Sequence, residues 1–174
     1  MTKNIGFIGY GLRSRTMMKA FAAIEADIRV TAIVDPRAEQ IRAEVADDPR
    51  FASTIYVESA EALLKMDALD GVFIGTRCSL HAPLASKVLA SGIPLYLEKP
   101  VCINDEQFQL LKAAAAGKTD RAVVSFPLRV SPLVREMKRI VDSGLLACTM
   151  VSLPSRPADY FCKRRPTTWT ISRT

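Results

Sequence analysis

The residues best suited to chemistry fall into three short groups: Gly9-Tyr10-Gly11-Leu12-Arg13-Ser14, then Asp35 with Arg37, then Glu98-Lys99-Pro100. A glycine pair at the start of a helix can bind a pyrophosphate, and a carboxylate some 20 residues later can bind ribose hydroxyls. A lysine can donate to an oxygen that becomes negatively charged. The order of these groups along the chain predicts nucleotide binding.

The first group follows a strand-like run and opens a helical one. Gly9 permits a tight turn, and Gly11 lets a phosphate approach the backbone. The amides of Leu12 and Arg13, at the N-terminus of the expected helix, then face the phosphates along a favourable dipole. Ser14 replaces the third glycine of the usual pattern and is still small enough for helix–strand packing. Cofactor contacts are therefore expected at these positions.

The second group decides which dinucleotide is expected. Asp35 ends the second expected strand, 24 residues after Gly11, so its carboxylate can accept from both ribose hydroxyls and repel a 2′-phosphate. NAD is therefore predicted. Arg37 keeps NADP open, because a guanidinium at that place could bind the phosphate. The alternative is a surface Asp-Pro-Arg turn that caps the next helix. Methyltransferases also combine a glycine loop with an acid, so these two groups do not choose a reaction.

The elements that position these groups alternate regularly. Apolar runs rich in Ile, Val and Phe predict strands, and longer amphipathic stretches between them predict helices. The strands are expected at residues 4–9, 28–34, 54–57, 71–75, 94–97 and 122–126, with 54–57 at an edge, and the helices at 12–24, 36–46, 59–66, 79–91, 104–116 and 132–143. This alternation predicts an α/β fold: a doubly wound (Rossmann) parallel sheet with helices on both faces.

The third group lies at the carboxyl edge of that sheet, where doubly wound folds bind ligands. Residues 76–100 carry Thr76, His81, a helix that ends in Ala-Ser-Gly92, a strand and then the Glu-Lys-Pro triplet. This stretch resembles the glucose–fructose oxidoreductase/inositol dehydrogenase (Gfo/Idh/MocA) family. Arg129-Val130-Ser131-Pro132 and the glycine turn near residue 144 resemble that family too, and the resemblance covers about residues 3–153.

The resemblance implies roles for single residues. Lys99 would lie beside the nicotinamide as the catalytic residue, polarising the hydroxyl-bearing carbon of the substrate; the alternative is a surface lysine at a strand end. Glu98 would lie near the nicotinamide ribose. Thr76 and His81 would border the cofactor cleft, although a structural role at the helix N-terminus suits His81 nearly as well. Arg129 would reach the nicotinamide end. Arg77-Cys78 replaces the family's Pro-Asn, so that asparagine's contacts are not carried over.

The resemblance also implies a function for the chain: an NAD(P)-dependent oxidoreductase acting on a sugar, polyol or related hydroxy compound. Residues 1–146 would be the dinucleotide-binding domain, and residues 147–174 the start of a truncated second domain with an irregular basic tail. The family's catalytic histidine, downstream of Lys99, has no counterpart here. We therefore expect little or no turnover from this chain alone. The alternatives are a non-catalytic dinucleotide-binding module, acting as a sensor or regulator, and an inactive truncated gene product.

The amino-acid composition limits the classes of binding partner that we expect. The net charge of +6 includes +4 within residues 151–174, so the body has no basic stripe for nucleic acid. No apolar run reaches the roughly 20 residues of a membrane span. Four cysteines without a Cys-x-x-Cys pair and one histidine predict no metal site and reduced thiols. We expect a cytoplasmic protein whose partners are the cofactor and a small hydroxy substrate; self-association stays open.

Overall fold

A six-stranded parallel sheet in the order β3-β2-β1-β4-β5-β6 organises the chain. The computed structural model describes residues 1–25, 27–67 and 69–143. The strands are β1 (Lys3–Ile8), β2 (Ile28–Val34), β3 (Ile55–Tyr56), β4 (Gly71–Ile74), β5 (Leu95–Leu97) and β6 (Ala122–Val124). Strand order reverses between β1 and β4, which creates the crevice where doubly wound sheets bind their ligands.

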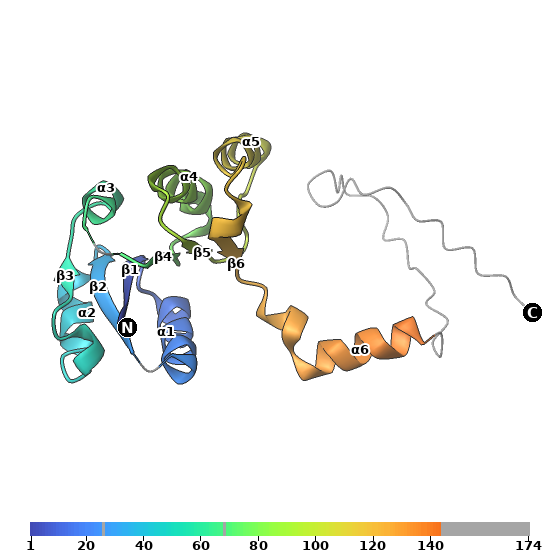
Figure 1. Cartoon of the computed structure of the whole chain (residues 1–174), viewed down its shortest axis with the longest axis horizontal. Helices are drawn as coiled ribbons and strands as arrows, with labels where there is room; N and C mark the ends of the chain where they lie inside the picture. Colours follow the sequence, from blue (N-terminus) through green and yellow to red (C-terminus); the bar gives the residue numbers. More distant parts are fainter. Residues whose placement is uncertain (26, 68, 144–174) are drawn as a thin grey trace, which may run out of the picture. The chain divides into compact units, whose positions relative to one another are not determined.

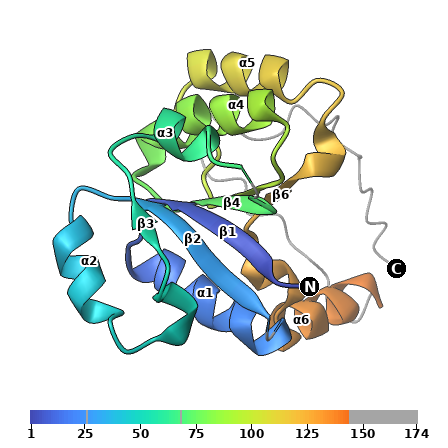
Figure 2. The same cartoon turned by 60° about the vertical axis from the view of Figure 1, so that its left-hand side comes forward.

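Helices cover both faces of the sheet, as the sequence predicted. α1 (Leu12–Ile24) and α2 (Ala38–Glu44) lie on one face, and α3 (Ala60–Leu64), α4 (His81–Ser91) and α5 (Asp105–Ala114) on the other (Figures 1 and 2). Short 3₁₀ turns are formed by η1 (Pro49–Phe51), η2 (Cys78–Leu80), η3 (Thr119–Arg121) and η4 (Pro127–Val130). The doubly wound fold class is therefore confirmed.

The core has one layer on each face because neighbouring strand residues point to opposite sides. In β1, Phe7 faces the layer that contains Met18 of α1 and Ile41 of α2. The next residue, Ile8, faces the layer that contains Leu63 of α3 and Val88 of α4. Both layers are fully enclosed at these residues, and they fix the strand ends that carry the site.

Polar residues and glycines mark several helix ends. The Ser59 hydroxyl accepts from the Ala62 N–H at the start of α3, and the Asn104 side chain accepts from the Gln107 N–H at the start of α5. Gly92 ends α4 with a φ of 78°, a left-handed conformation that favours glycine. These positions agree with the predicted helix starts and stops.

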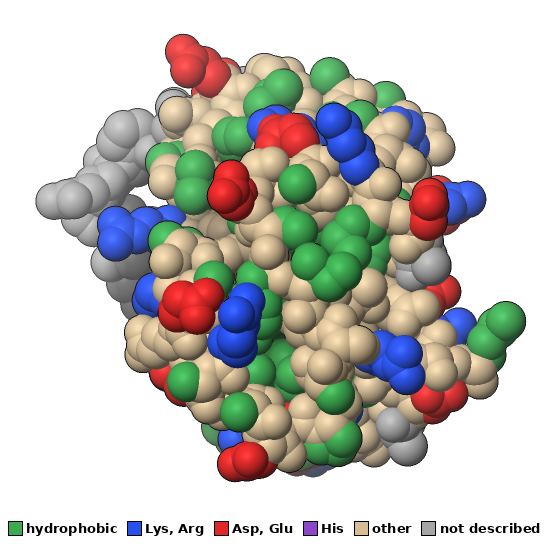
Figure 3. All heavy atoms as spheres, turned by 90° about the vertical axis from the view of Figure 1, so that its left-hand side faces the viewer, with side chains coloured by type: hydrophobic (Ala, Val, Ile, Leu, Met, Phe, Trp, Pro, Cys, Tyr) green, Lys and Arg blue, Asp and Glu red, His purple; other side chains and the backbone are tan. Residues whose placement is uncertain are grey.

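Residues 1–131 form one compact unit, and the chain divides after it. Beyond that division, α6 (Pro132–Asp142) is described. The expected boundaries at 146 and 147 remain predictions, because residues 144–174 lie outside the described part. On the face in Figure 3, positive and negative side chains are interspersed. In the described residues, no helix combines the length and the apolar character that crossing a membrane requires.

Candidate functional site

The glycine loop joins β1 to α1 in a shape that requires glycine at position 9. Gly9 has a φ of 82°, and a Cβ there would lie 2.8 Å from the Thr76 Cγ2 and 2.9 Å from the Gly75 carbonyl oxygen. A Cβ on Gly11 would meet nothing within 4 Å. The backbone at Gly11 is therefore open on the side from which a ligand would approach.

The N-terminus of α1 offers its amides to an anion. The first N–H groups of a helix have no partner within the helix and lie at the positive end of its dipole. The first turn of α1, all of it described, carries no acidic side chain. The N-cap residue is Gly11, so no side chain caps the helix there. The Leu12 side chain is exposed, and its backbone N–H belongs to this first turn.

Ser14 performs the packing role of the missing third glycine. It is fully buried, and its hydroxyl donates to the Gly9 carbonyl oxygen at 2.7 Å. Across the interface, a Cβ on Gly75 would lie only 2.2 Å from the Ser14 Oγ. The space for the Ser14 hydroxyl thus comes from the absence of a side chain at Gly75, which sequence reasoning did not identify.

Asp35 is held against the glycine loop. Its carboxylate accepts from the Tyr10 N–H at 2.8 Å and from the Arg37 N–H at 2.9 Å. The Arg37 Nε and Nη2 donate to the two carboxylate oxygens, each at 3.1 Å. Burial disfavours the charged carboxylate, but these hydrogen bonds outweigh it and hold the pKa of Asp35 below its usual value. The Asp35 side chain is only 5% exposed and its charge is paired with Arg37, an arrangement that also fits the alternative of an Asp-Pro-Arg turn before α2.

Tyr10 anchors this loop in the core. Its ring packs edge-on against Phe7 and Phe51, with centroid distances of 5.1 and 5.6 Å. Burial raises the pKa of Tyr10 to about 12, so the hydroxyl stays protonated under ordinary conditions. The side chain between the two glycines is thus structural, and it points away from the open side of the loop.

The remaining candidate residues surround one cavity of about 660 Å³. Its lining includes six of the residues predicted from the sequence: Arg13, Thr76, His81, Glu98, Lys99 and Arg129. Gly9, Gly11, Leu12, Asp35 and Arg37 are not among its lining residues. The predicted residues therefore form two groups, one about the glycine loop and β2 and one about the ends of β4, β5 and β6.

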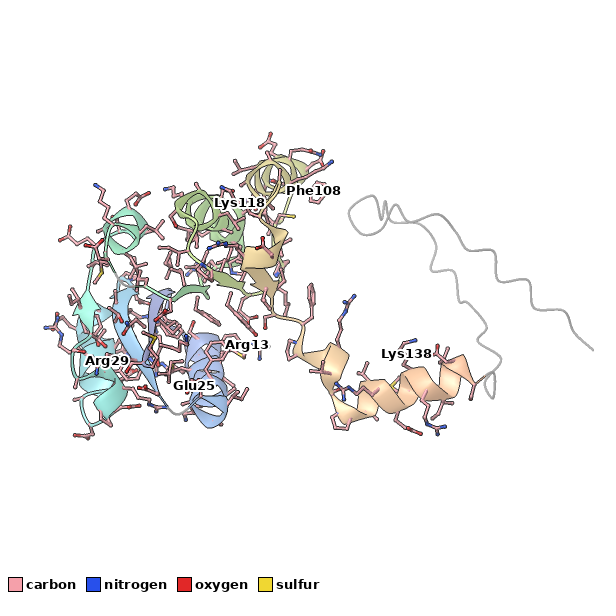
Figure 4. The ribbon with its side chains drawn as sticks, viewed as in Figure 1. Arg13, Glu25, Arg29, Phe108, Lys118 and Lys138 are labelled. Carbon is pink, nitrogen blue, oxygen red and sulfur yellow. The ribbon has the colours of Figure 1, made fainter. Side chains whose placement is uncertain are left out.

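Within the cavity, Arg13 pairs with Glu98. Arg13 projects from the first turn of α1 (Figure 4), and its Nε lies 3.1 Å from the Glu98 Oε1. Glu98 is only 4% exposed. Its carboxylate, which the resemblance places near a ribose, is therefore already bound to Arg13. Lys99 is exposed, which leaves its ammonium group accessible at the cavity.

His81 connects the loops after β4 and β5. Its Nδ1 lies 2.6 Å from the Pro100 carbonyl oxygen and its Nε2 lies 3.2 Å from the Thr76 carbonyl oxygen. The ring is 1% exposed although it borders the cavity. This geometry favours the structural alternative, in which His81 positions the turn that carries Lys99.

We expect His81→Ala to lower the free energy of unfolding by about 2–4 kcal/mol, because it leaves a buried cavity and removes the ring N–H donor from a carbonyl oxygen. His81→Asn should recover part of this loss, since its amide nitrogen occupies the position of Nδ1. Urea unfolding measures both effects, with Leu80→Ala at the neighbouring, half-exposed residue as control. Wild-type stability of His81→Ala would contradict this role.

Several cavity residues were missed by sequence reasoning: Gly75, Cys78, Ser125, Phe126, Pro127 and Leu128. A signal existed for Ser125, a polar residue directly after a buried strand, at the sheet edge that also carries Glu98. Cys78 and Cys102 are free thiols; Cys148 and Cys162 lie outside the described residues. Among the residues described, no cluster of His, Cys, Asp and Glu has the makings of a metal site.

Known proteins are similar to this chain in sequence and in fold. The model of the Gfo/Idh/MocA oxidoreductase family, described as an NAD-binding Rossmann fold, matches residues 3–126. Inositol 2-dehydrogenase 2 of Saccharopolyspora erythraea is 28% identical over 145 residues, which are 83% of this chain and 42% of that protein. The chain thus spans less than half the length of this relative.

Two solved structures show the same fold. A myo-inositol dehydrogenase from Lactobacillus casei, in complex with NAD(H) and myo-inositol, superposes with a TM-score of 0.71 at 23% identity, over 83% of this chain and 42% of that one. KijD10, a 3-ketoreductase from Actinomadura kijaniata in complex with NADP and TDP-benzene, superposes with a TM-score of 0.68 at 26% identity, over 84% of this chain and 44% of that one.

Proposed function

This chain belongs to the Gfo/Idh/MocA family of oxidoreductases, and we propose that it binds NAD(H) and serves the oxidation of a hydroxyl-bearing carbon in a polyol or sugar. The polyol assignment is supported by the inositol dehydrogenases among its relatives. Because the chain spans less than half of their length, the complete reaction is proposed for this chain together with whatever completes its substrate pocket.

The placement of the two residue groups on opposite sides of the β1–β4 crevice carries this proposal. Asp35 follows β2 on one side of the glycine loop, and Lys99 follows β5 on the other. A dinucleotide whose pyrophosphate lies at Gly11 can therefore extend one ribose toward Asp35 and its nicotinamide toward the cavity. Each end of the ligand then meets the residue type suited to it.

Lys99 has the chemistry for the oxygen of the substrate. The nicotinamide, when bound, accepts or returns a hydride. The Lys99 ammonium can donate a hydrogen bond to the alcohol or carbonyl oxygen and stabilise negative charge as it develops there. Glu98 is not suited to this role, because a carboxylate paired with Arg13 can only accept hydrogen bonds and would repel the developing negative charge. We therefore assign Lys99 as the catalytic residue and Glu98 as its neighbour in the cofactor site.

We also propose small-molecule partners and a cytoplasmic location. The interspersed charges on the face in Figure 3 support a small ligand over a nucleic acid. The free thiols of Cys78 and Cys102 are typical of a reducing compartment.

The wild-type chain should bind NADH at least about ten-fold more tightly than NADPH, because the ionised Asp35 accepts from ribose hydroxyls and repels a 2′-phosphate. Calorimetric titration with each cofactor measures this ratio. Arg37→Ala should preserve the preference, as should Arg42→Ala, which removes another exposed arginine nearby. Equal or tighter binding of NADPH would show that Arg37 sets the preference. Failure of both cofactors to bind would overturn the proposed function.

A further inference from the structure

Ser125 is a buried polar residue without a hydrogen-bond partner for its side chain in the described part of the chain. It follows β6 and is only 2% exposed. Its backbone N–H donates to the Leu97 carbonyl oxygen at 2.8 Å, but its Oγ has no partner among the described residues. A buried hydroxyl that gives up water without gaining a partner destabilises the free protein. A ligand bound beside Ser125 would supply the missing hydrogen-bond partner.

The cavity beside Lys99 is where that ligand would lie, because Ser125 is one of its lining residues. In the register of the sheet Leu97 pairs with Val124, which sets Ser125 beside Glu98. The Glu98 carboxylate is already engaged by Arg13. Rotation about the Cα–Cβ bond moves a serine hydroxyl between staggered positions, so a ligand in the cavity can meet the Ser125 Oγ.

We propose that the Ser125 hydroxyl hydrogen-bonds the carboxamide of the bound nicotinamide, an inference that rests on the proposed function. Four charged side chains of the cavity suit charged or developing-charge groups: Arg13, Glu98, Lys99 and Arg129. A carboxamide is neutral and carries both donors and an acceptor, which matches a hydroxyl that can donate and accept.

The order of the strands indicates which end of a bound dinucleotide lies near Ser125. β6 is three strands from β1, on the side away from β2, and at about 4.8 Å per strand this is roughly 14 Å across the sheet. A dinucleotide with its adenosine ribose at Asp35 and its pyrophosphate at the glycine loop extends its nicotinamide half toward β6. Ser125 therefore lies on the side of the cavity that the nicotinamide end approaches.

Ser125→Ala tests the contact by comparing two ligands on the full 174-residue chain. NADH should bind about three- to ten-fold more weakly to the variant, the range expected for one neutral hydrogen bond. ADP-ribose, which lacks the nicotinamide, should bind wild type and variant equally. Calorimetric titration of both ligands gives the two ratios directly.

The melting temperature of Ser125→Ala without ligand is a second measurement, and it should not fall as the NADH affinity does. Without ligand, Ser125→Ala should melt at the same temperature as the wild type or about 2–4 °C higher, because it removes an unsatisfied hydroxyl. Thr31→Val is the matched control: the Thr31 Oγ1 is also buried without a partner among the described residues, but Thr31 lies in β2 and does not line the cavity. It should leave both affinities unchanged.

The outcomes separate this inference from the proposed function. A selective loss of NADH affinity with retained stability supports the Ser125 contact. Equal NADH binding by wild type and Ser125→Ala overturns it while NAD binding stands. Equal losses for NADH and ADP-ribose also overturn it, because the hydroxyl would then act through the fold. A wild-type chain that binds neither ligand overturns the proposed function and this inference together.

Discussion

Gly75→Ala should lower the free energy of unfolding by about 2–4 kcal/mol and abolish measurable NADH binding. A Cβ at this position would lie 2.2 Å from the Ser14 Oγ and 2.7 Å from the Phe73 Cε1, and both of those side chains are fully buried. Overpacking of this kind typically costs about 1–3 kcal/mol. Displacing Ser14 would also break its hydrogen bond to the Gly9 carbonyl oxygen, adding about 0.5–1.5 kcal/mol. Urea unfolding and NADH titration measure the two effects.

Gly71→Ala, at the start of β4, provides the matched control for Gly75, which directly follows that strand. Its Cβ would lie 3.5 Å from the Ile5 Cδ1 and 3.6 Å from the Pro94 carbonyl oxygen, which are ordinary contacts. We expect near wild-type stability. Ser14→Gly combined with Gly75→Ala should recover part of the lost stability, because the closest clash is removed. If the double variant were no more stable than Gly75→Ala, the Ser14–Gly75 contact would not be the cause.

Asp35→Ala should weaken NADH binding at least about 100-fold. The variant would lose the hydrogen bonds that we propose between the Asp35 carboxylate and two ribose hydroxyls, and bonds to a charged group are worth about 1.5–3 kcal/mol each. Asp35→Asn should show a smaller loss, because one oxygen remains able to accept. Calorimetry measures both affinities; for Asp35→Ala, an unchanged NADH affinity would place the ribose elsewhere.

The same carboxylate should make stability depend on pH. The folded-state pKa of Asp35 lies below its usual value. Its contribution is therefore fully present above the unfolded-state pKa of about 3.9 and is lost as the pH falls through the folded-state pKa. Unfolding free energies measured from pH 6 to pH 2 should converge for wild type and Asp35→Asn at the acid end. Parallel curves would contradict the shifted pKa.

The alternation of apolar runs was sufficient to predict each of the strands found in the described residues, and the order in which the candidate groups reach the sheet edge. Residues 12–24 form a helix with the bounds that the periodicity predicts. The helix expected from residue 36 begins at Ala38 instead, because the Asp35 carboxylate first accepts from the Arg37 N–H. The helix expected from residue 79 begins at His81 after the 3₁₀ turn η2, which hydrophobic periodicity does not distinguish from an α-helix.

The pairings within the site could not be predicted from the sequence. Arg13 and Glu98 are 85 residues apart, and the sequence around neither residue predicts their ion pair. The complementarity of Ser14 and Gly75 likewise depends on how closely α1 approaches β4. Motifs therefore indicate which residues meet a ligand, whereas the partners that orient those residues depend on the tertiary packing.

The central position of β1 also has a consequence that we expect for folding. β1 lies between β2 and β4, and the Asn4 N–H donates to the Asp70 carboxylate, 66 residues further along the chain. Closing so long a loop is an entropically costly and slow step. The turn at Gly9, where a Cβ would collide with Gly75 and Thr76, can be enclosed only when that loop has closed. We therefore expect the glycine loop to reach its final shape late in folding, after residues 71–76 have joined the sheet.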